Sequence, residues 1–308
     1  MRVGVIGVGV MGKNHARVYS KLPGVELVGI ADIDSESASA TAKTYHTRAF
    51  TDYEQLLKQN LDAVTIAVPT SLHKKVSLDV VQAGVSMLVE KPIADTVENA
   101  DEIISASRRK GVKLMVGHIE RFNPIVPVLK ESIKNSHVIS MGITRVGPLP
   151  PRIKDVGIVI DLATHDIDLI RYLTDSEFKR VYPLTSKSAS GQEDSAILCF
   201  ELENGVLAYS IVNWLTPFKV REINIATEGK LVKGWFQEQK VVEYMQYKKE
   251  DGSYIAKELA VPSAEPLKVE LEAFIKSVRN NEEPPVTGYD GLAALKVAET
   301  CSGGLIKE

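Results

Sequence analysis

The chain has 308 residues, of which 44% are hydrophobic and 25% are charged. This is a globular composition, and it excludes a fibrous or wholly disordered chain. The length predicts about two domains, because single cores rarely grow beyond roughly 250–300 residues. The formal net charge is -3 and no long run of Lys and Arg occurs, so the basic footprint of a nucleic-acid-binding protein is missing.

The sequence carries no pattern for membrane insertion or export. Its longest apolar runs, such as residues 63–68, fall far below the roughly 18 residues that a membrane-spanning helix needs. The first residues lack the apolar core and cleavage site of a secretory signal peptide. Two cysteines, Cys199 and Cys301, form no CxxC or Cys/His cluster. We therefore expect a cytoplasmic protein without a disulfide framework or a cysteine-ligated metal.

Residues 1–120 are expected to form one domain, because short β-branched runs alternate there with helical patterns. Strands are predicted at residues 2–6, 26–31, 63–67, 86–89 and 113–116, and helices at 11–21, 35–45, 53–59, 74–83 and 94–110. Such alternation is typical of βαβ units around a parallel sheet. The predicted fold is α/β, an N-terminal Rossmann domain that binds a dinucleotide.

Residues 121–308 show a different pattern and are expected to form a second domain. Helices are predicted at 124–134 and 160–173, and strands at 137–145, 181–189, 195–202, 206–214, 221–227, 229–237 and 240–247. Turns such as Glu203-Asn204-Gly205 join neighbouring strands as in hairpins. The pattern predicts an α+β domain on a largely antiparallel sheet. Two final helices, at 266–280 and 288–305, follow, and the last is expected to pack back against the N-terminal domain.

A GxGxxG motif lies directly after the first predicted strand and directly before a helical pattern. In this setting the first glycine permits a tight turn, the second admits a pyrophosphate, and the third lets helix and strand pack closely. The start of the helix offers N–H groups to the phosphates. The predicted cofactor contacts in this loop are Gly7, Val8, Gly9, Val10, Met11 and Gly12.

Asp32 lies at the end of the second predicted strand, 20 residues after Gly12. A carboxylate at this place accepts hydrogen bonds from the adenosine ribose and repels a 2′-phosphate, which favours NAD over NADP. The alternative is that Asp32 caps the helix beginning near Ser35, a role for which Asp34 also qualifies.

Two further segments end at the same edge of the predicted sheet. Glu90 and Lys91 follow the strand at 86–89, and Pro69, Thr70 and His73 follow the strand at 63–67. Ligands of open α/β sheets bind at the carboxyl ends of the strands, so we predict that these five residues contact the cofactor. Lys91 would also hold a substrate hydroxyl or its alkoxide. The alternatives are a solvated lysine and a capping or surface role for His73.

The second half concentrates titratable groups at Asp161, His165 and Asp166. On a helix Asp161 and His165 share one face, so the carboxylate can orient the imidazole. Histidine is the usual proton carrier near neutral pH. A metal site formed by all three is the alternative, but Asp166 lies off the shared face and hydride transfer needs no metal. We therefore expect no metal.

The crossover between the predicted domains carries His118, Arg121 and Asn123. Polar residues beside a nucleotide fold suit a substrate rim, although Arg121 and Asn123 serve equally well as hinge braces and helix caps. Arg145 and Arg152 flank a proline-rich run, and such a pair is suited to bind a phosphate or carboxylate of the substrate.

Three motifs together, Gly7-Val8-Gly9-Val10-Met11-Gly12, Glu90-Lys91-Pro92 and Asp161-x-x-x-His165-Asp166, resemble the Gfo/Idh/MocA oxidoreductase family in order and spacing. The resemblance implies a C-terminal open sheet that often forms an oligomer interface. It also implies that Lys91, Asp161 and His165 line the reacting carbon, with Lys91 and His165 as the acid/base candidates. It leaves the isomer of the Lys91-Pro92 bond open.

Within that family, residues 118–124 and 147–157 resemble archaeal enzymes that oxidise UDP-N-acetylglucosamine at the 3-position. A departure is the single glycine of Asp155-Val156-Gly157, where many members carry several. The expected function is NAD-dependent oxidation of a sugar-nucleotide hydroxyl by a homo-oligomer, a dimer or tetramer. The alternatives are an inositol or free-sugar dehydrogenase, an NAD-dependent glycosidase, and a regulatory nucleotide-binding protein, against which the Lys91/Asp161/His165 set argues.

Overall fold

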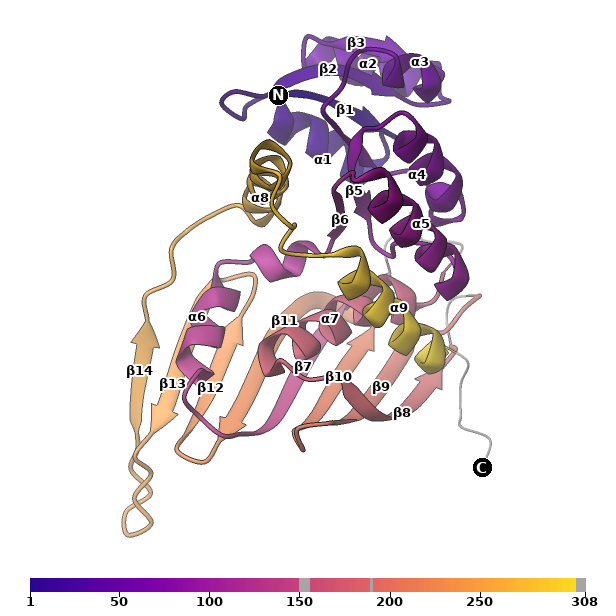
Figure 1. Ribbon diagram of the computed structural model, residues 1–308. Coiled ribbons are helices and arrows are strands. Elements are labelled where there is room, and N and C mark those ends of the chain that lie inside the picture. Colours follow the sequence, from indigo (N-terminus) through magenta and orange to yellow (C-terminus); the bar gives the residue numbers. More distant parts are fainter. Residues whose placement is uncertain (150–155, 189–190, 303–308) are drawn as a thin grey trace. The chain divides into compact units, whose positions relative to one another are not determined.

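The computed structural model describes residues 1–149, 156–188 and 191–302 (Figure 1). The chain divides into two compact units. The first contains Met1–Ile119 and Pro266–Ala293, so it includes a helix from the C-terminal part of the chain. The second contains Glu120–Glu265 and the residues from Ala294 onward. None of the helices in the described ranges is long and apolar enough to cross a membrane.

The first unit is a parallel six-stranded sheet in the order β3-β2-β1-β4-β5-β6, which confirms the predicted Rossmann fold. Its strands are β1 (Arg2–Ile6), β2 (Glu26–Ala31), β3 (Arg48–Phe50), β4 (Ala63–Ile66), β5 (Ser86–Glu90) and β6 (Leu114–Gly117). Its helices are α1 (Val10–Tyr19), α2 (Ser35–Thr44), α3 (Tyr53–Leu57), α4 (His73–Gln82), α5 (Val97–Lys110) and α8 (Pro266–Asn280). The strand order reverses between β1 and β4, where such sheets bind ligands.

The second unit is an eight-stranded sheet in the order β14-β13-β12-β11-β7-β10-β9-β8. Only β7 and β10 pair in parallel, so the predicted, largely antiparallel α+β architecture is confirmed. The strands are β7 (Val138–Pro148), β8 (Phe178–Ser186), β9 (Ser195–Leu202), β10 (Leu207–Asn213), β11 (Leu215–Thr227), β12 (Lys230–Trp235), β13 (Lys240–Met245) and β14 (Ile255–Leu259). The helices are α6 (Ile125–Ile133), α7 (Thr164–Thr174) and α9 (Gly288–Ser302), whose first residues belong to the first unit.

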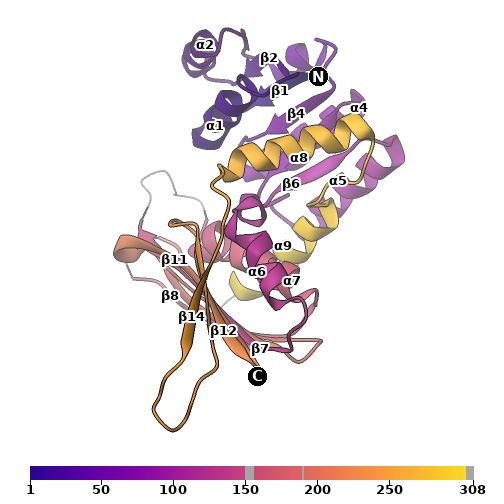
Figure 2. The same ribbon diagram turned by 90° about the vertical axis from the view of Figure 1, so that its left-hand side faces the viewer.

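One face of this second sheet forms the core of its unit, and α6 and α7 lie on that face (Figure 2). Strand residues alternate between the two faces, so Leu198 and Phe200 are buried in the core while Ile197 and Leu207 are 45% and 58% exposed. The outer face thus carries apolar side chains, as the core face does. Polar side chains lie on the outer face too, such as Glu222 and Asn224, which alternate along β11 with the buried Ile223 and Ile225.

Candidate active site

The glycine loop has the geometry that each of its glycines was predicted to provide. Gly7 adopts a φ of +88°, which favours glycine. A Cβ on Gly12 would lie 1.8 Å from the backbone oxygen of Gly7, whereas a Cβ on Gly9 would meet nothing within 4 Å. Gly9 is also the N-cap of α1, and no side chain caps that end. The loop therefore offers open space and N–H groups to a phosphate.

Asp32 organises this loop rather than capping a helix. Its Oδ2 accepts a hydrogen bond from the backbone N–H of Val8 at 2.7 Å, and its Oδ1 accepts one from Asp34 N–H at 2.9 Å. The N-cap of α2 is Asp34, which accepts a hydrogen bond from Glu36 N–H. Each carboxylate oxygen has a second lone pair, so Asp32 retains the capacity to accept hydrogen bonds from a ribose.

Lys91 stands in a turn that two histidines hold in place. The turn follows β5, and its Lys91-Pro92 peptide bond is cis. His73 lies buried between the carbonyl of Pro92, 2.8 Å from Nδ1, and that of Val68, 3.0 Å from Nε2. It thus links the chain segments that follow β4 and β5. Burial lowers the pKa of His73 despite these carbonyls. His73 is therefore not the surface residue that the sequence left possible.

The second histidine, His15 of α1, contacts the carboxylate beside Lys91. Its Nε2 lies 2.7 Å from Oε1 of Glu90. Burial tends to raise the pKa of Glu90, but the hydrogen bond and charge of His15, together with the charge of Lys91, bring it below its usual range. Thr65 Oγ1 lies 3.3 Å from Nδ1 of His15 and 2.9 Å from the hydroxyl of Tyr19. A buried polar chain therefore runs from Tyr19 to Glu90.

A second buried carboxyl, Glu270 of α8, lies near this chain. It is 0% exposed, and neither of its oxygens has a hydrogen-bond partner among the described residues. Burial and the charge of Glu90 raise its pKa well above the ordinary value. Sequence reasoning missed His15 and Glu270. One signal for Glu270 existed, because it lies on the helix stripe that carries the buried residues Leu267 and Leu271.

Asp161 and His165 belong to consecutive helical segments of the second unit. Asp161 lies in a π-helical turn, η3 (Val159–Ala163), and is 8% exposed, while His165 lies in the first turn of α7. Local π-helical geometry often accompanies functional sites. Asp166 projects into the protein, where its Oδ1 accepts a hydrogen bond from Arg145 Nε at 2.6 Å and its Oδ2 accepts one from Ser210 at 2.8 Å.

The residues predicted for a substrate rim have partners inside the protein. Arg121 donates two hydrogen bonds to Asp168, at 2.7 and 2.6 Å. Asn123 donates a hydrogen bond to the carbonyl of Phe236 and accepts one from Ile125 N–H at the start of α6. These are the contacts of a brace and a helix cap. His118 is 1% exposed.

Of the predicted arginine pair, Arg145 is 2% exposed, and its Nη1 donates a hydrogen bond to Glu120 at 2.8 Å. Burial lowers its pKa, but the charges of Asp166 and Glu120 outweigh burial and raise it. Arg152 lies outside the described residues.

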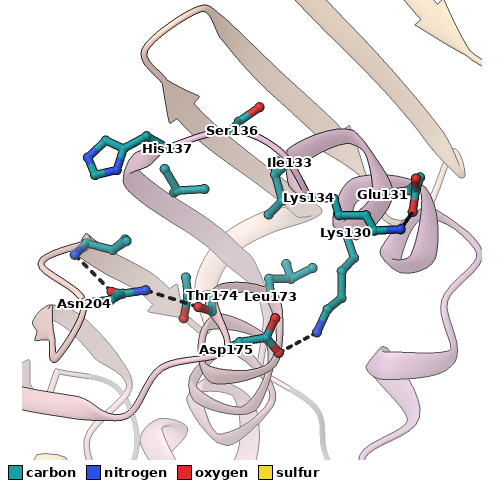
Figure 3. Close-up of a pocket in the computed structure, with 12 residues that line it drawn as sticks. Lys130, Glu131, Ile133, Lys134, Ser136, His137, Leu173, Thr174, Asp175 and Asn204 are labelled. Atoms are coloured by element: carbon teal, nitrogen blue, oxygen red, sulfur yellow. Dashed lines mark hydrogen bonds and ion pairs between the residues drawn. The ribbon is translucent and has the colours of Figure 1, made fainter.

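The cavity shown in Figure 3 lies elsewhere in the second unit. Its volume is about 610 Å³, and it is lined by residues at the ends of α6 and α7. Lys130 points to Asp175 there, with 2.7 Å between Nζ and Oδ1. None of the predicted site residues lines this cavity. Within the described ranges, no three His, Cys, Asp or Glu side chains are grouped to hold a metal ion.

Comparison with known proteins places this architecture in a family. Residues 1–118 match the oxidoreductase family with an NAD-binding Rossmann fold, and residues 147–232 match the GFO/IDH/MocA C-terminal domain. The chain belongs to the Gfo/Idh/MocA family. It is therefore an oxidoreductase of a family whose named members act on hydroxyl groups.

Individual relatives have two kinds of substrate in their names. UDP-N-acetylglucosamine 3-dehydrogenase of Acidithiobacillus ferrooxidans is 35% identical over 68% of this chain and 65% of its own length. A solved structure of that enzyme has a TM-score of 0.93 at 27% identity, covering 99% of this chain and 97% of the other. Inositol 2-dehydrogenase of Corynebacterium glutamicum is 30% identical over 76% of this chain and 72% of its own length. The first of these relatives is bacterial, which corrects the archaeal affiliation suggested by the sequence.

Proposed function

We propose that the protein oxidises a sugar-nucleotide hydroxyl with NAD+, converting UDP-N-acetylglucosamine to its 3-keto derivative. The observation that carries the proposal is the fit of nearly the whole chain to UDP-N-acetylglucosamine 3-dehydrogenase, with a TM-score of 0.93. The sequence likeness to the same enzyme supports it.

In this proposal, side chains of the protein bind the substrate hydroxyl and remove its proton. The nicotinamide cofactor supplies the hydride acceptor. His165, oriented by Asp161, takes the proton of the substrate hydroxyl, and Lys91 stabilises the negative charge that develops on that oxygen. His165→Ala should lower kcat by about 10²- to 10⁴-fold while NAD+ binding stays near wild type, because the glycine loop and Asp32 are in the other unit. Near-wild-type turnover of this variant would remove His165 from the role.

We infer NAD rather than NADP from Asp32. Its carboxylate lies at the end of β2 and is held by Val8 N–H, where a 2′-phosphate would meet like charge. Initial rates with NAD+ and NADP+ at equal concentration test this. Asp32→Asn, which removes the negative charge, should reduce the preference for NAD+ over NADP+. A wild-type preference for NADP+ would overturn the inference.

A second candidate is the oxidation of an inositol, since several inositol 2-dehydrogenases match over more than 90% of the chain. The two candidates differ in size and charge of the substrate. NADH formation should be measured with UDP-N-acetylglucosamine, UDP-glucose, glucose and myo-inositol, with a keto-acid reoxidant in parallel in case NADH stays bound. Turnover of UDP-N-acetylglucosamine supports the proposal, and turnover of only glucose or myo-inositol overturns it.

The protein is also proposed to act as a homo-oligomer through the outer face of its second sheet. Leu184, Ile197, Leu207 and Leu231 are each at least 40% exposed on strands of this sheet. Large apolar side chains exposed on one sheet face are a feature of surfaces that contact another subunit.

A further inference from the structure

The second unit places two arginines directly opposite each other on neighbouring strands. Arg221 of β11 pairs in register with Arg145 of β7. Residues opposite each other in an antiparallel ladder project from the same face, and like charges in that arrangement destabilise the sheet. Arg145 projects from the face that carries α7, because it is bound to Asp166. Arg221 therefore brings a second guanidinium to the helix-covered face.

The guanidinium groups of Arg145 and Arg221 differ in their hydrogen-bond partners. Arg145 has carboxylate partners at Nε and Nη1. The buried Nη1 of Arg221 and the buried Nη2 of Arg145 have no hydrogen-bond partner among the described residues. Leaving a buried N–H without an acceptor is costly, more so when the group is charged. Two such groups on adjacent arginines leave N–H donors for which the described residues provide no acceptor, and a ligand oxygen would suit them.

Arg221 is cationic, and several acidic side chains, Asp161 among them, act on its pKa. Burial and the neighbouring charge of Arg145 lower the pKa of Arg221 to about 10, and Asp166, Glu120 and Asp161 act in the opposite direction. Arg221 therefore remains protonated at neutral pH.

We propose that Arg221 is a specificity-determining residue that binds an anionic oxygen of the substrate, a phosphoryl or carboxylate oxygen. The guanidinium fork matches these groups, and the charge would contribute little toward a neutral cyclitol or hexose. The inference deepens the proposed function and rests on it. Of the two arginines expected from the sequence, Arg145 already neutralises Asp166, and Arg152 lies outside the described residues.

The test uses Arg221→Gln and Arg221→Lys in the full-length protein. For UDP-N-acetylglucosamine, Arg221→Gln should raise KM by about 10- to 100-fold, the loss expected for one charged hydrogen bond. The kcat should change little, and NAD+ affinity should not change. Arg221→Lys should restore part of the loss, which a merely structural role would not predict. Arg109→Gln, at an exposed position of α5, is the matched control and should behave as wild type.

Calorimetric titration with UDP, and turnover of glucuronate, separate the sources of the anionic oxygen. Weaker UDP binding by Arg221→Gln supports a phosphoryl contact. Glucuronate turnover whose KM depends on Arg221 supports a carboxylate contact and overturns the sugar-nucleotide assignment. If wild type oxidises UDP-N-acetylglucosamine and both Arg221 variants keep its KM, the Arg221 proposal fails while the proposed function stands. If wild type oxidises only neutral substrates, both fail.

Discussion

The buried carboxyl of Glu270 should make the stability of the protein depend on pH in a predictable direction. Its pKa is raised well above the ordinary value by burial and by Glu90, whereas in the unfolded chain a glutamate titrates near about 4.3. Above that pH the unfolded state has released a proton that the folded state keeps. The free energy of unfolding therefore falls by about 1.4 kcal/mol per pH unit until the pH reaches the folded pKa.

Glu270→Gln should remove this dependence, because the amide is neutral in both states and close to the acid in shape. The variant should gain stability over wild type as the pH rises above about 5, by about 1.4 kcal/mol per pH unit. Urea unfolding followed by circular dichroism at several pH values measures the difference. Glu272→Gln, at an exposed position of the same helix, is the control. A Glu270→Gln difference that does not change with pH would refute the reasoning.

The contribution of Glu90 to the pH dependence of stability should have the opposite sign to that of Glu270. Its pKa lies below the ordinary value because His15 and Lys91 outweigh burial. Its contribution to stability is therefore present above the unfolded pKa and lost as the pH falls through the folded pKa. Glu90→Gln should destabilise the protein at neutral pH by about 1–3 kcal/mol, the usual cost of weakening a buried hydrogen bond to a charged group.

Four further variants test other parts of the structure. Gly12→Ala should prevent stable folding of the loop, because its Cβ would lie 1.8 Å from a backbone oxygen. Gly9→Ala should fold normally but bind NAD+ more weakly. Thermal melts measure the stability of each variant, and NADH fluorescence measures its cofactor binding. Arg121→Ala should lose about 3–5 kcal/mol of stability in urea unfolding, because Asp168 would be left buried without its bidentate partner. Leu207→Glu should reduce the molar mass in light scattering if the outer sheet face joins subunits, and an unchanged oligomer would exclude that face.

The geometry of the glycine loop was largely predictable because its signals are local. Gly7, Gly9 and Gly12 act within one turn between a strand and a helix, and Asp32 follows at the next strand end. The conformation of each glycine depends on neighbours along the chain, so the spacing of the motif predicts it. The cofactor contacts of these residues and of Asp32 stay predictions. The short strand β3 was missed because its three residues, Arg48–Phe50, are too few to show alternation.

The buried polar groups could not be predicted because they depend on contacts between distant segments. His15 forms a hydrogen bond with Glu90, although 75 residues separate them in the sequence. Glu270 lies near both on α8, a helix that the sequence analysis assigned to the other domain. Arg221 acquires its place only through the pairing of β7 with β11. Neither strand pattern specifies that register, so the sequence had no means of distinguishing Arg145 from Arg221.

Asp161 and Asp166 belong to the same sequence motif, but their packing in the structure gives them different roles. Asp166 is fully buried, and Arg145 and Ser210 occupy its two oxygens. It thus fixes α7 against the sheet. Asp161 lies one turn earlier, in the π-helical segment, and is the acid that we propose orients His165. Because Arg145 neutralises Asp166, Arg221 is the arginine that we propose binds a ligand. The Arg145–Asp166 ion pair thus has two effects: it anchors α7 to the sheet, and it leaves Arg221 as the arginine that can recognise the substrate.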